Sequence, residues 1–272
     1  MTLRLLNALL NPHKIVQNLW ARTGLGSFKS RLDYDVFPRP HYAFCLYHAA
    51  RQAHLLGLKR ISAAEFGVAG GAGLIELEDL ADAVEKEFPV EIEIYGFDTG
   101  GGLPEPVDFR DLPYIWKAGF YKMDQDALRK KLRRASLVLG DVKDTVPSFI
   151  ENHDPAPIGA AFFDLDFWSS TSEALKIFEA PQSHMLPRVM CYCDDVISSE
   201  HGGLLNEYVG QLAAIRGYNA QHANRKLTTI AGLDRVRRIP ACWNDQVYVH
   251  HAFDHPLYNV YIHSDANRQL PI

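Results

Sequence analysis

Residues 61–88 read ISAAEFGVAGGAGLIELEDLADAVEKEF, in which a short apolar run, a glycine cluster and an amphipathic segment follow one another directly. The run at 61–66 predicts a buried strand, and the glycines at 67–73 predict a tight turn. Residues 74–88 place Leu77, Leu80 and Val84 on one helical face, so a helix is expected there. Strand, glycine turn and helix in this order predict the opening of a βαβ unit.

The same alternation continues on both sides of this unit. Further strands are expected at residues 92–97, 136–139, 158–163 and 188–192, and helices at 42–56, 128–135, 171–178 and 204–215. Beyond them, residues 227–230, 235–239, 247–250 and 258–262 have a β-rich composition. The fold class predicted is therefore α/β, a doubly wound and mostly parallel sheet that ends in a C-terminal antiparallel hairpin.

The first 40 residues differ from the rest and form a helical N-terminal extension in this interpretation. Apolar residues recur at helical spacing until Gly24, Gly26 and Pro38 interrupt the pattern. We expect a lid or a dimer arm over residues 1–40, hence a homodimer, and one domain over 41–272. A helix that merely packs on the main domain is an equal alternative.

Composition excludes several classes of protein. The 272 residues carry a net charge of −5 with 47% hydrophobic side chains, as in a globular domain large enough to need no disulfide or structural metal. The basic run at 129–134 is read as a solvated helix face, so no nucleic-acid partner is expected. Neither a signal peptide nor a long apolar span is found, which predicts a cytoplasmic protein without a membrane partner.

Two strand ends carry the first candidate ligand-binding residues. Glycines after the strand at 61–66 let a ligand approach the backbone closely, and Asp98, which ends the next strand, is placed to accept both hydroxyls of a ribose. The glycines do not follow the G-x-G-x-x-G pattern, and no P-loop lysine is present. An adenosine ligand without a pyrophosphate is therefore favoured, with an NAD-dependent oxidoreductase as a weaker alternative.

Four ordered motifs now resemble a known family. They are EFGVAGGAG at 65–73, GFDTGGGLP at 96–104, GDVKDTVP at 140–147, and FDLDFWSST at 163–171 paired with Asp194-Asp195. Together they resemble the class I S-adenosylmethionine-dependent methyltransferases, and most closely the metal-dependent macrocin O-methyltransferase-like branch. The resemblance covers residues 65–195, roughly the central half of the chain, and implies a Rossmann-like seven-stranded sheet.

The resemblance also implies a cofactor site. Glu65 and Gly67 would line the methionine and ribose portions of S-adenosylmethionine, Asp98 would hold the ribose, and Asp141 with Val142 would border the adenine. The implied cofactor-binding set is completed by Val68, Ala69, Gly71, Thr99 and Asp164. The chain departs from the pattern at Ala69, where many members have glycine, and at Val196, where the branch has an aromatic residue.

A group of aspartates makes a separate physical case for a metal. Asp164 and Asp166 end one predicted strand, and Asp194 and Asp195 end the next, so the four carboxyl groups are expected at one edge of the sheet. Unpaired carboxylates repel one another unless a cation lies between them, and oxygen ligands favour Mg²⁺ or Ca²⁺ over zinc. We expect Asp164, Asp194 and Asp195 to bind Mg²⁺, as the resemblance also implies, and Asp166 to cap the following helix. The alternative is that all of them are helix caps.

Candidate general bases are Asp164, His201 and His251, although a structural role for each histidine is a simpler interpretation. Trp116 and Tyr121 belong to an aromatic stretch that either covers the cofactor or forms an ordered loop. The function expected is a metal-assisted, S-adenosylmethionine-dependent O-methyltransferase acting on a small-molecule hydroxyl acceptor, such as a sugar or a catechol-like ring. An adenosine-binding protein of the same fold with a regulatory role is the alternative.

Overall fold

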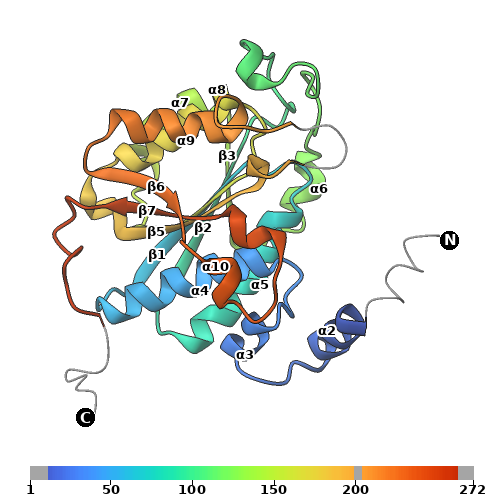
Figure 1. Cartoon of the computed structure of the whole chain (residues 1–272), viewed down its shortest axis with the longest axis vertical. Helices are drawn as coiled ribbons and strands as arrows, with labels where there is room; N and C mark the ends of the chain where they lie inside the picture. The colour runs from blue at the N-terminus through green and yellow to red at the C-terminus, as the bar shows by residue number, and fades with distance from the viewer. Residues whose placement is uncertain (1–11, 199–203, 263–272) are drawn as a thin grey trace.

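The computed structural model describes residues 12–198 and 204–262, and within them one mixed sheet of seven strands lies at the centre of the molecule (Figure 1). The strands follow the order β3-β2-β1-β4-β5-β7-β6. Their bounds are β1 Arg60–Phe66, β2 Glu91–Asp98, β3 Ser136–Leu139, β4 Ile158–Phe163, β5 Met185–Cys193, β6 Arg225–Thr229 and β7 Val247–Ala252. Strands β1 to β5 are parallel, while β7 pairs antiparallel with both β5 and β6. The predicted doubly wound sheet with a C-terminal antiparallel hairpin is confirmed.

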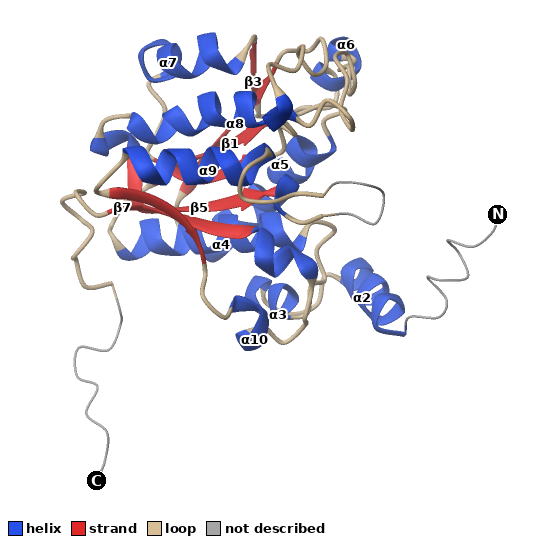
Figure 2. Ribbon diagram, turned by 45° about the horizontal axis from the view of Figure 1, so that its top comes forward, coloured by secondary structure: helices blue, strands red, loops and turns tan. Residues whose placement is uncertain are grey.

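Helices cover both faces of the sheet, with α4, α5 and α10 on one side and α7, α8 and α9 on the other (Figures 1 and 2). Their bounds are α4 Pro40–Leu55, α5 Ala72–Glu87, α6 Gln125–Arg129, α7 Val142–His153, α8 Trp168–Ala174, α9 Gly210–Gln221 and α10 Leu233–Val236. Short 3₁₀ helices lie at Phe109–Asp111, Leu175–Glu179, Gln182–His184, Asp194–Val196 and Cys242–Gln246. Each face of the sheet has its own apolar core.

The central strands explain why a site forms at one edge. Every residue of β4 is buried, as expected for a parallel strand covered on both faces. Phe66, at the end of β1, is in register with Phe97 of β2 and Phe163 of β4. The Phe66 ring stacks on both neighbours, with centroid distances of 4.6 Å to Phe97 and 5.0 Å to Phe163. The residues that directly follow β1, β2 and β4 therefore lie next to one another at the same edge of the sheet.

Two of the predicted tail strands are wrong. Residues 235–239 form no strand, because Gly232, with φ of 73°, starts the short helix α10, and Arg237 then pairs with Asp35 of the N-terminal segment. Residues 258–262 lie in turns and irregular structure, where the Tyr258 carbonyl accepts a hydrogen bond of 3.0 Å from Arg188. Both stretches have a strand-like composition, but side-chain contacts with distant segments determine their conformation.

The described part of the N-terminal extension contains helices α2 (Pro12–Thr23) and α3 (Phe28–Asp33). Phe28 and Leu32 of α3 are buried in the same core as α4 and α5, whereas Val16 and Leu19 of α2 are exposed. Both figures place α2 beside α3, at the margin of the molecule. Residues 1–11, where Leu3, Leu6, Leu9 and Leu10 recur at helical spacing, lie outside the described residues. None of the described helices is long and apolar enough to cross a bilayer.

Candidate functional site

A cavity of about 290 Å³ opens beyond the carboxyl ends of the parallel strands. Seven of the ten predicted cofactor-binding residues line it: Gly67, Ala69, Asp98, Thr99, Asp141, Val142 and Asp164. The two other predicted metal ligands, Asp194 and Asp195, line it too. Its remaining walls are Gly102, Leu103, Pro104, Trp116, Tyr121, Leu165, Asp166 and Ser170. The tertiary structure thus brings the predicted cofactor and metal residues into one space.

The turn after β1 approaches the end of β4 very closely. Gly67 has a φ of 89°, and a Cβ atom added to it would lie 1.7 Å from the backbone oxygen of Asp164. Only glycine satisfies both conditions. Ala69, the departure from the glycine-rich pattern, also has a positive φ, 46°, so it keeps the left-handed conformation at the cost of some strain.

Asp98 holds this turn in place. Its Oδ2 accepts hydrogen bonds of 2.9 Å from the backbone N–H groups of both Val68 and Ala69, and its Oδ1 accepts one of 2.6 Å from Gly100. Asp98 also lines the cavity, and its carboxylate can accept a further hydrogen bond beyond these three. Asp98 therefore links the two strand ends and presents a negative charge where the turn meets the cavity.

At the end of β3, Asp141 caps helix α7. Its carboxylate accepts a hydrogen bond of 3.0 Å from the Lys143 backbone N–H and lies 3.0 Å from the Lys143 ammonium. The cap fixes the direction of the chain as it passes the cavity, and it positions Val142 as a buried apolar wall. This arrangement provides one polar and one apolar surface side by side.

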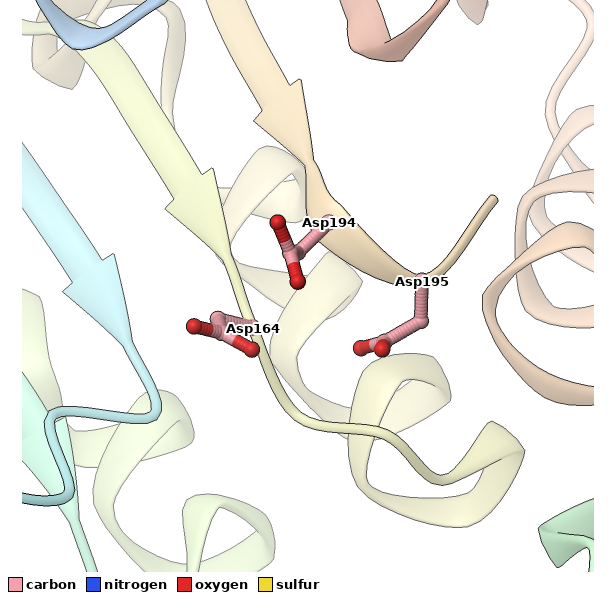
Figure 3. A group of neighbouring side chains, drawn as sticks. All are labelled: Asp164, Asp194 and Asp195. Atoms are coloured by element: carbon pink, nitrogen blue, oxygen red, sulfur yellow. The ribbon is translucent and has the colours of Figure 1, made fainter. Parts of the chain in front are cut away.

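Asp164, Asp194 and Asp195 form a compact group of carboxylates. One oxygen from each lies within 4.8 Å of the others, and Figure 3 shows the three side chains around a common space beyond the ends of β4 and β5. In the described part of the chain the Asp164 carboxylate accepts no hydrogen bond, whereas Asp194 accepts one from the Tyr192 hydroxyl. Oxygen atoms at this spacing suit a hard divalent cation.

Gln211 of α9 orients the third member of this group. Its Nε2 donates hydrogen bonds of 3.2 Å to the Asp195 carboxylate and 3.1 Å to the Phe163 carbonyl, and it is fully buried. The Asp166 backbone N–H adds a hydrogen bond of 2.9 Å to Asp195. Gln211 was missed in the sequence, because nothing in its local pattern indicates that α9 reaches the ends of β4 and β5.

The electrostatics of the group follow from burial and mutual repulsion. Burial, Asp194 and Asp166 raise the pKa of Asp164 to about 7, and burial with Asp194 raises the pKa of Asp166 to about 7. Burial and the neighbouring carboxylates also raise the pKa of Asp195 well above its ordinary value. These raised pKa values reflect repulsion between the ionised carboxylates, which a cation bound between them would relieve.

Three predicted cofactor residues lie behind the cavity wall. Glu65 is buried, and its Oε1 accepts a hydrogen bond of 2.8 Å from Tyr42, while its Oε2 has no partner among the described residues. Val68 is buried and reaches the site through its backbone N–H, and Gly71, with φ of 82°, is the residue from which α5 begins. These three residues shape the wall but do not line the cavity.

The prediction that Asp166 caps a helix is wrong. Phe167 precedes α8 without a side-chain cap, and Asp166, with φ of 59°, is one of the residues that line the cavity. The cap is supplied by Asp111, which accepts hydrogen bonds of 2.8 Å from both the N–H and the hydroxyl of Ser169. A capping residue so distant in sequence cannot be found from local spacing.

The structure describes one of the two predicted histidine bases, His251, and does not bring it to the cavity. His251 pairs with Arg188 and Lys226 on the neighbouring strands, near the amino end of β5, and its Nδ1 lies 2.8 Å from the Tyr258 hydroxyl. The cavity is at the opposite, carboxyl end of β5, so the structure does not bring His251 to it. His201 lies outside the described residues. Of the two predicted catalytic residues that the structure describes, Asp164 lines the cavity.

Comparison with known proteins addresses the fold. The sequence matches no protein-family model and no curated protein. Among solved structures, the calicheamicin methyltransferase CalS11 superposes with a TM-score of 0.50 at 20% identity, over 89% of this chain and 93% of that one. The chain has the Rossmann-like methyltransferase fold. The O-methyltransferase NovP has a TM-score of 0.49 at 15% identity, over 76% of this chain and 78% of that one.

Proposed function

We propose that this protein is an S-adenosylmethionine-dependent O-methyltransferase, assisted by a divalent cation and acting on a hydroxyl group of a small molecule. A sugar or a catechol-like ring is the expected acceptor class, because neighbouring oxygens on such a ring can both contact one cation. The similarity to CalS11, a calicheamicin methyltransferase, supports a natural-product acceptor by analogy of fold alone.

One observation carries the proposal. A single cavity joins the turn after β1, Asp98 and the Asp141–Val142 pair to the carboxylates of Asp164, Asp194 and Asp195. A ligand-binding part and an acidic part therefore share one open space, which a purely regulatory adenosine-binding protein would not require. Helix caps, the simpler interpretation of the aspartates, account for Asp141 but not for this group.

The polar groups of the cavity suit an adenosine ligand better than a dinucleotide. In dinucleotide sites the backbone N–H groups of the glycine turn bind the pyrophosphate. Here the N–H groups of Val68 and Ala69 already donate to the Asp98 carboxylate, whose charge would repel a phosphate. The Asp98 carboxylate lines the cavity and can accept a further hydrogen bond, so it is instead suited to bind a ribose hydroxyl, and the apolar side chain of Val142 is suited to an adenine ring.

The acidic group also fits a divalent cation. Asp164, Asp194 and Asp195 would supply the oxygen ligands, and Gln211 with the Asp166 backbone would keep Asp195 in orientation. A bound Mg²⁺ would lower the pKa of a hydroxyl group in contact with it. The protein residues then position that hydroxyl beside the cofactor, which is the larger part of the expected catalysis.

The proposal is tested by isothermal titration of S-adenosylmethionine and S-adenosylhomocysteine into the purified protein, with and without Mg²⁺. We expect micromolar binding that is lost in Asp98→Ala and retained in Asp144→Ala, because Asp144 is exposed on α7 outside the cavity lining. A melting curve for each variant separates lost binding from lost folding. If neither ligand binds the wild-type protein, the proposal is wrong.

A further inference from the structure

Tyr121 is held in an unusual backbone conformation at the mouth of the cavity. Its φ of 60° is an outlier for an aromatic residue, and such strain persists only where the surroundings impose it. The chain on either side is fixed to the Gly100–Leu103 turn, since the Leu103 N–H donates to the Phe120 carbonyl at 2.9 Å and the Met123 N–H donates to the Gly100 carbonyl at 3.3 Å. The strained residue is thus a built part of the cavity wall.

Tyr121 and Trp116 form an aromatic pair in the cavity lining. Their ring centroids are 6.1 Å apart, and both side chains line the cavity, whereas Tyr114 and Phe120 of the same loop do not. Tyr121 remains 51% exposed although it lines a cavity, so part of its ring is free to contact a ligand. Partial burial and the nearby carboxylates of Asp166, Asp195 and Asp164 raise the pKa of the Tyr121 phenol. The ring therefore lies on the same side of the cavity as the proposed metal ligands.

The charge of the cavity is strongly one-sided. Six aspartates line it, and none of the described lining residues is Lys, Arg or His. Asp98 and Asp141 are compensated by backbone N–H groups and by Lys143, but the other four face one another without a cation among the lining residues. Arg39 lowers the pKa of Asp164 from outside the lining. A divalent cation leaves one negative charge of its three carboxylate ligands uncompensated even when Asp166 is protonated, so an anionic acceptor would be repelled.

We propose that Tyr121, with Trp116, selects the acceptor, and that this acceptor is an uncharged or cationic compound whose hydroxyl-bearing ring packs against these two side chains. The inference rests on the proposed function and goes beyond it by assigning the charge of the substrate and the residue that recognises its ring. Tyr121 is a specificity-determining residue here and takes no part in proton transfer.

Three matched catechols test the inference: dopamine, 3,4-dihydroxybenzyl alcohol and 3,4-dihydroxybenzoate. Each is titrated calorimetrically into protein saturated with S-adenosylhomocysteine and Mg²⁺. We expect the cationic and neutral probes to bind at least about tenfold more tightly than the benzoate. Tyr121→Ala should weaken the two favoured probes by about tenfold, while Tyr121→Phe retains binding within about threefold because the ring is kept. Tyr114→Ala, on the same loop but outside the lining, is the matched control.

The outcomes separate the two proposals. If S-adenosylhomocysteine fails to bind the wild-type protein, both proposals fall. If it binds normally but the benzoate is preferred, no catechol binds, or Tyr121→Ala behaves like Tyr114→Ala, the acceptor assignment alone is overturned. Where methyl transfer to a favoured probe is measurable, Tyr121→Ala should raise KM with little change in kcat, and an equal fall in kcat would contradict a selective role.

Discussion

The hydroxyl of Tyr42, on α4, donates a hydrogen bond of 2.8 Å to Oε1 of Glu65, at the end of β1. Glu65 is only 2% exposed, and within the part of the chain that the structure describes its Oε2 has no hydrogen-bond partner. Burial raises the pKa of Glu65 to about 8, and nearby Asp164 acts in the same direction, against the opposing effect of the Tyr42 hydrogen bond. Near neutral pH this carboxyl group is therefore largely protonated behind the cavity wall.

This predicts a stability that falls with rising pH. Between the ordinary value of 4.5 and about 8, the folded state keeps a proton on Glu65 that the unfolded state has lost. The free energy of unfolding therefore decreases as the pH rises through this window. In Glu65→Gln we expect a shallower decrease and a higher stability than wild type near the top of it, as measured by urea denaturation at several pH values. An unchanged slope would show that Glu65 is ionised in the folded protein.

The geometry of the turn after β1 predicts a large loss of stability for alanine at one glycine and a small change at another. Gly67→Ala should destabilise the protein by at least about 3 kcal/mol, because its Cβ would collide with the Asp164 backbone and its φ is positive. Gly70→Ala should change stability by less than about 1 kcal/mol, because a Cβ there meets no atom within 4 Å. Chemical denaturation of both variants measures the difference, and similar losses would contradict this geometry.

Metal binding should depend on pH. Because the pKa values of Asp164 and Asp166 are raised to about 7 and that of Asp195 is also raised, protons compete with the cation below this pH. We expect Mg²⁺ affinity, measured by calorimetry, to increase from about pH 6 to about pH 8. Asp194→Asn should lose most of the affinity, while Asp144→Asn should keep it. A pH-independent affinity would argue for a site elsewhere.

Asp111 should be important for stability although it lies outside the cavity. It is fully buried and accepts hydrogen bonds of 2.8 Å from the Val107 N–H and from both donors of Ser169. Asp111→Ala leaves these donors without their acceptor, so we expect a loss of about 3 kcal/mol in urea denaturation. Asp108→Ala, at the solvent-accessible cap of the neighbouring 3₁₀ helix, should cost clearly less than Asp111→Ala. Equal losses would mean that burial of the cap is unimportant.

Local pattern was sufficient for the core of the fold. The glycine turn between β1 and α5, the buried apolar strands and the aspartates at their ends were predicted before any contact was known, and the structure confirms them. Each of these depends on neighbours in sequence: a helix face repeats every three to four residues, and a parallel strand buried on both faces is a continuous apolar run. Because parallel strands share one carboxyl edge, Asp98, Asp164 and Asp194 could also be grouped in advance.

Only the tertiary structure decided which residues serve that edge. Residues 235–239 have the composition of a strand, but Arg237 forms an ion pair with Asp35, which is distant in sequence. Asp111 caps α8 and Gln211 orients Asp195 from elements that are distant in sequence, and Asp166 faces the cavity because its backbone adopts a left-handed conformation. His251 satisfies the requirements for a base in sequence, yet strand register pairs it with Arg188, in the amino-terminal half of β5 and away from the carboxyl end where the cavity lies. The sequence by itself determined where strands end, since that depends on local pattern, whereas long-range contacts and register decided which side chains meet there.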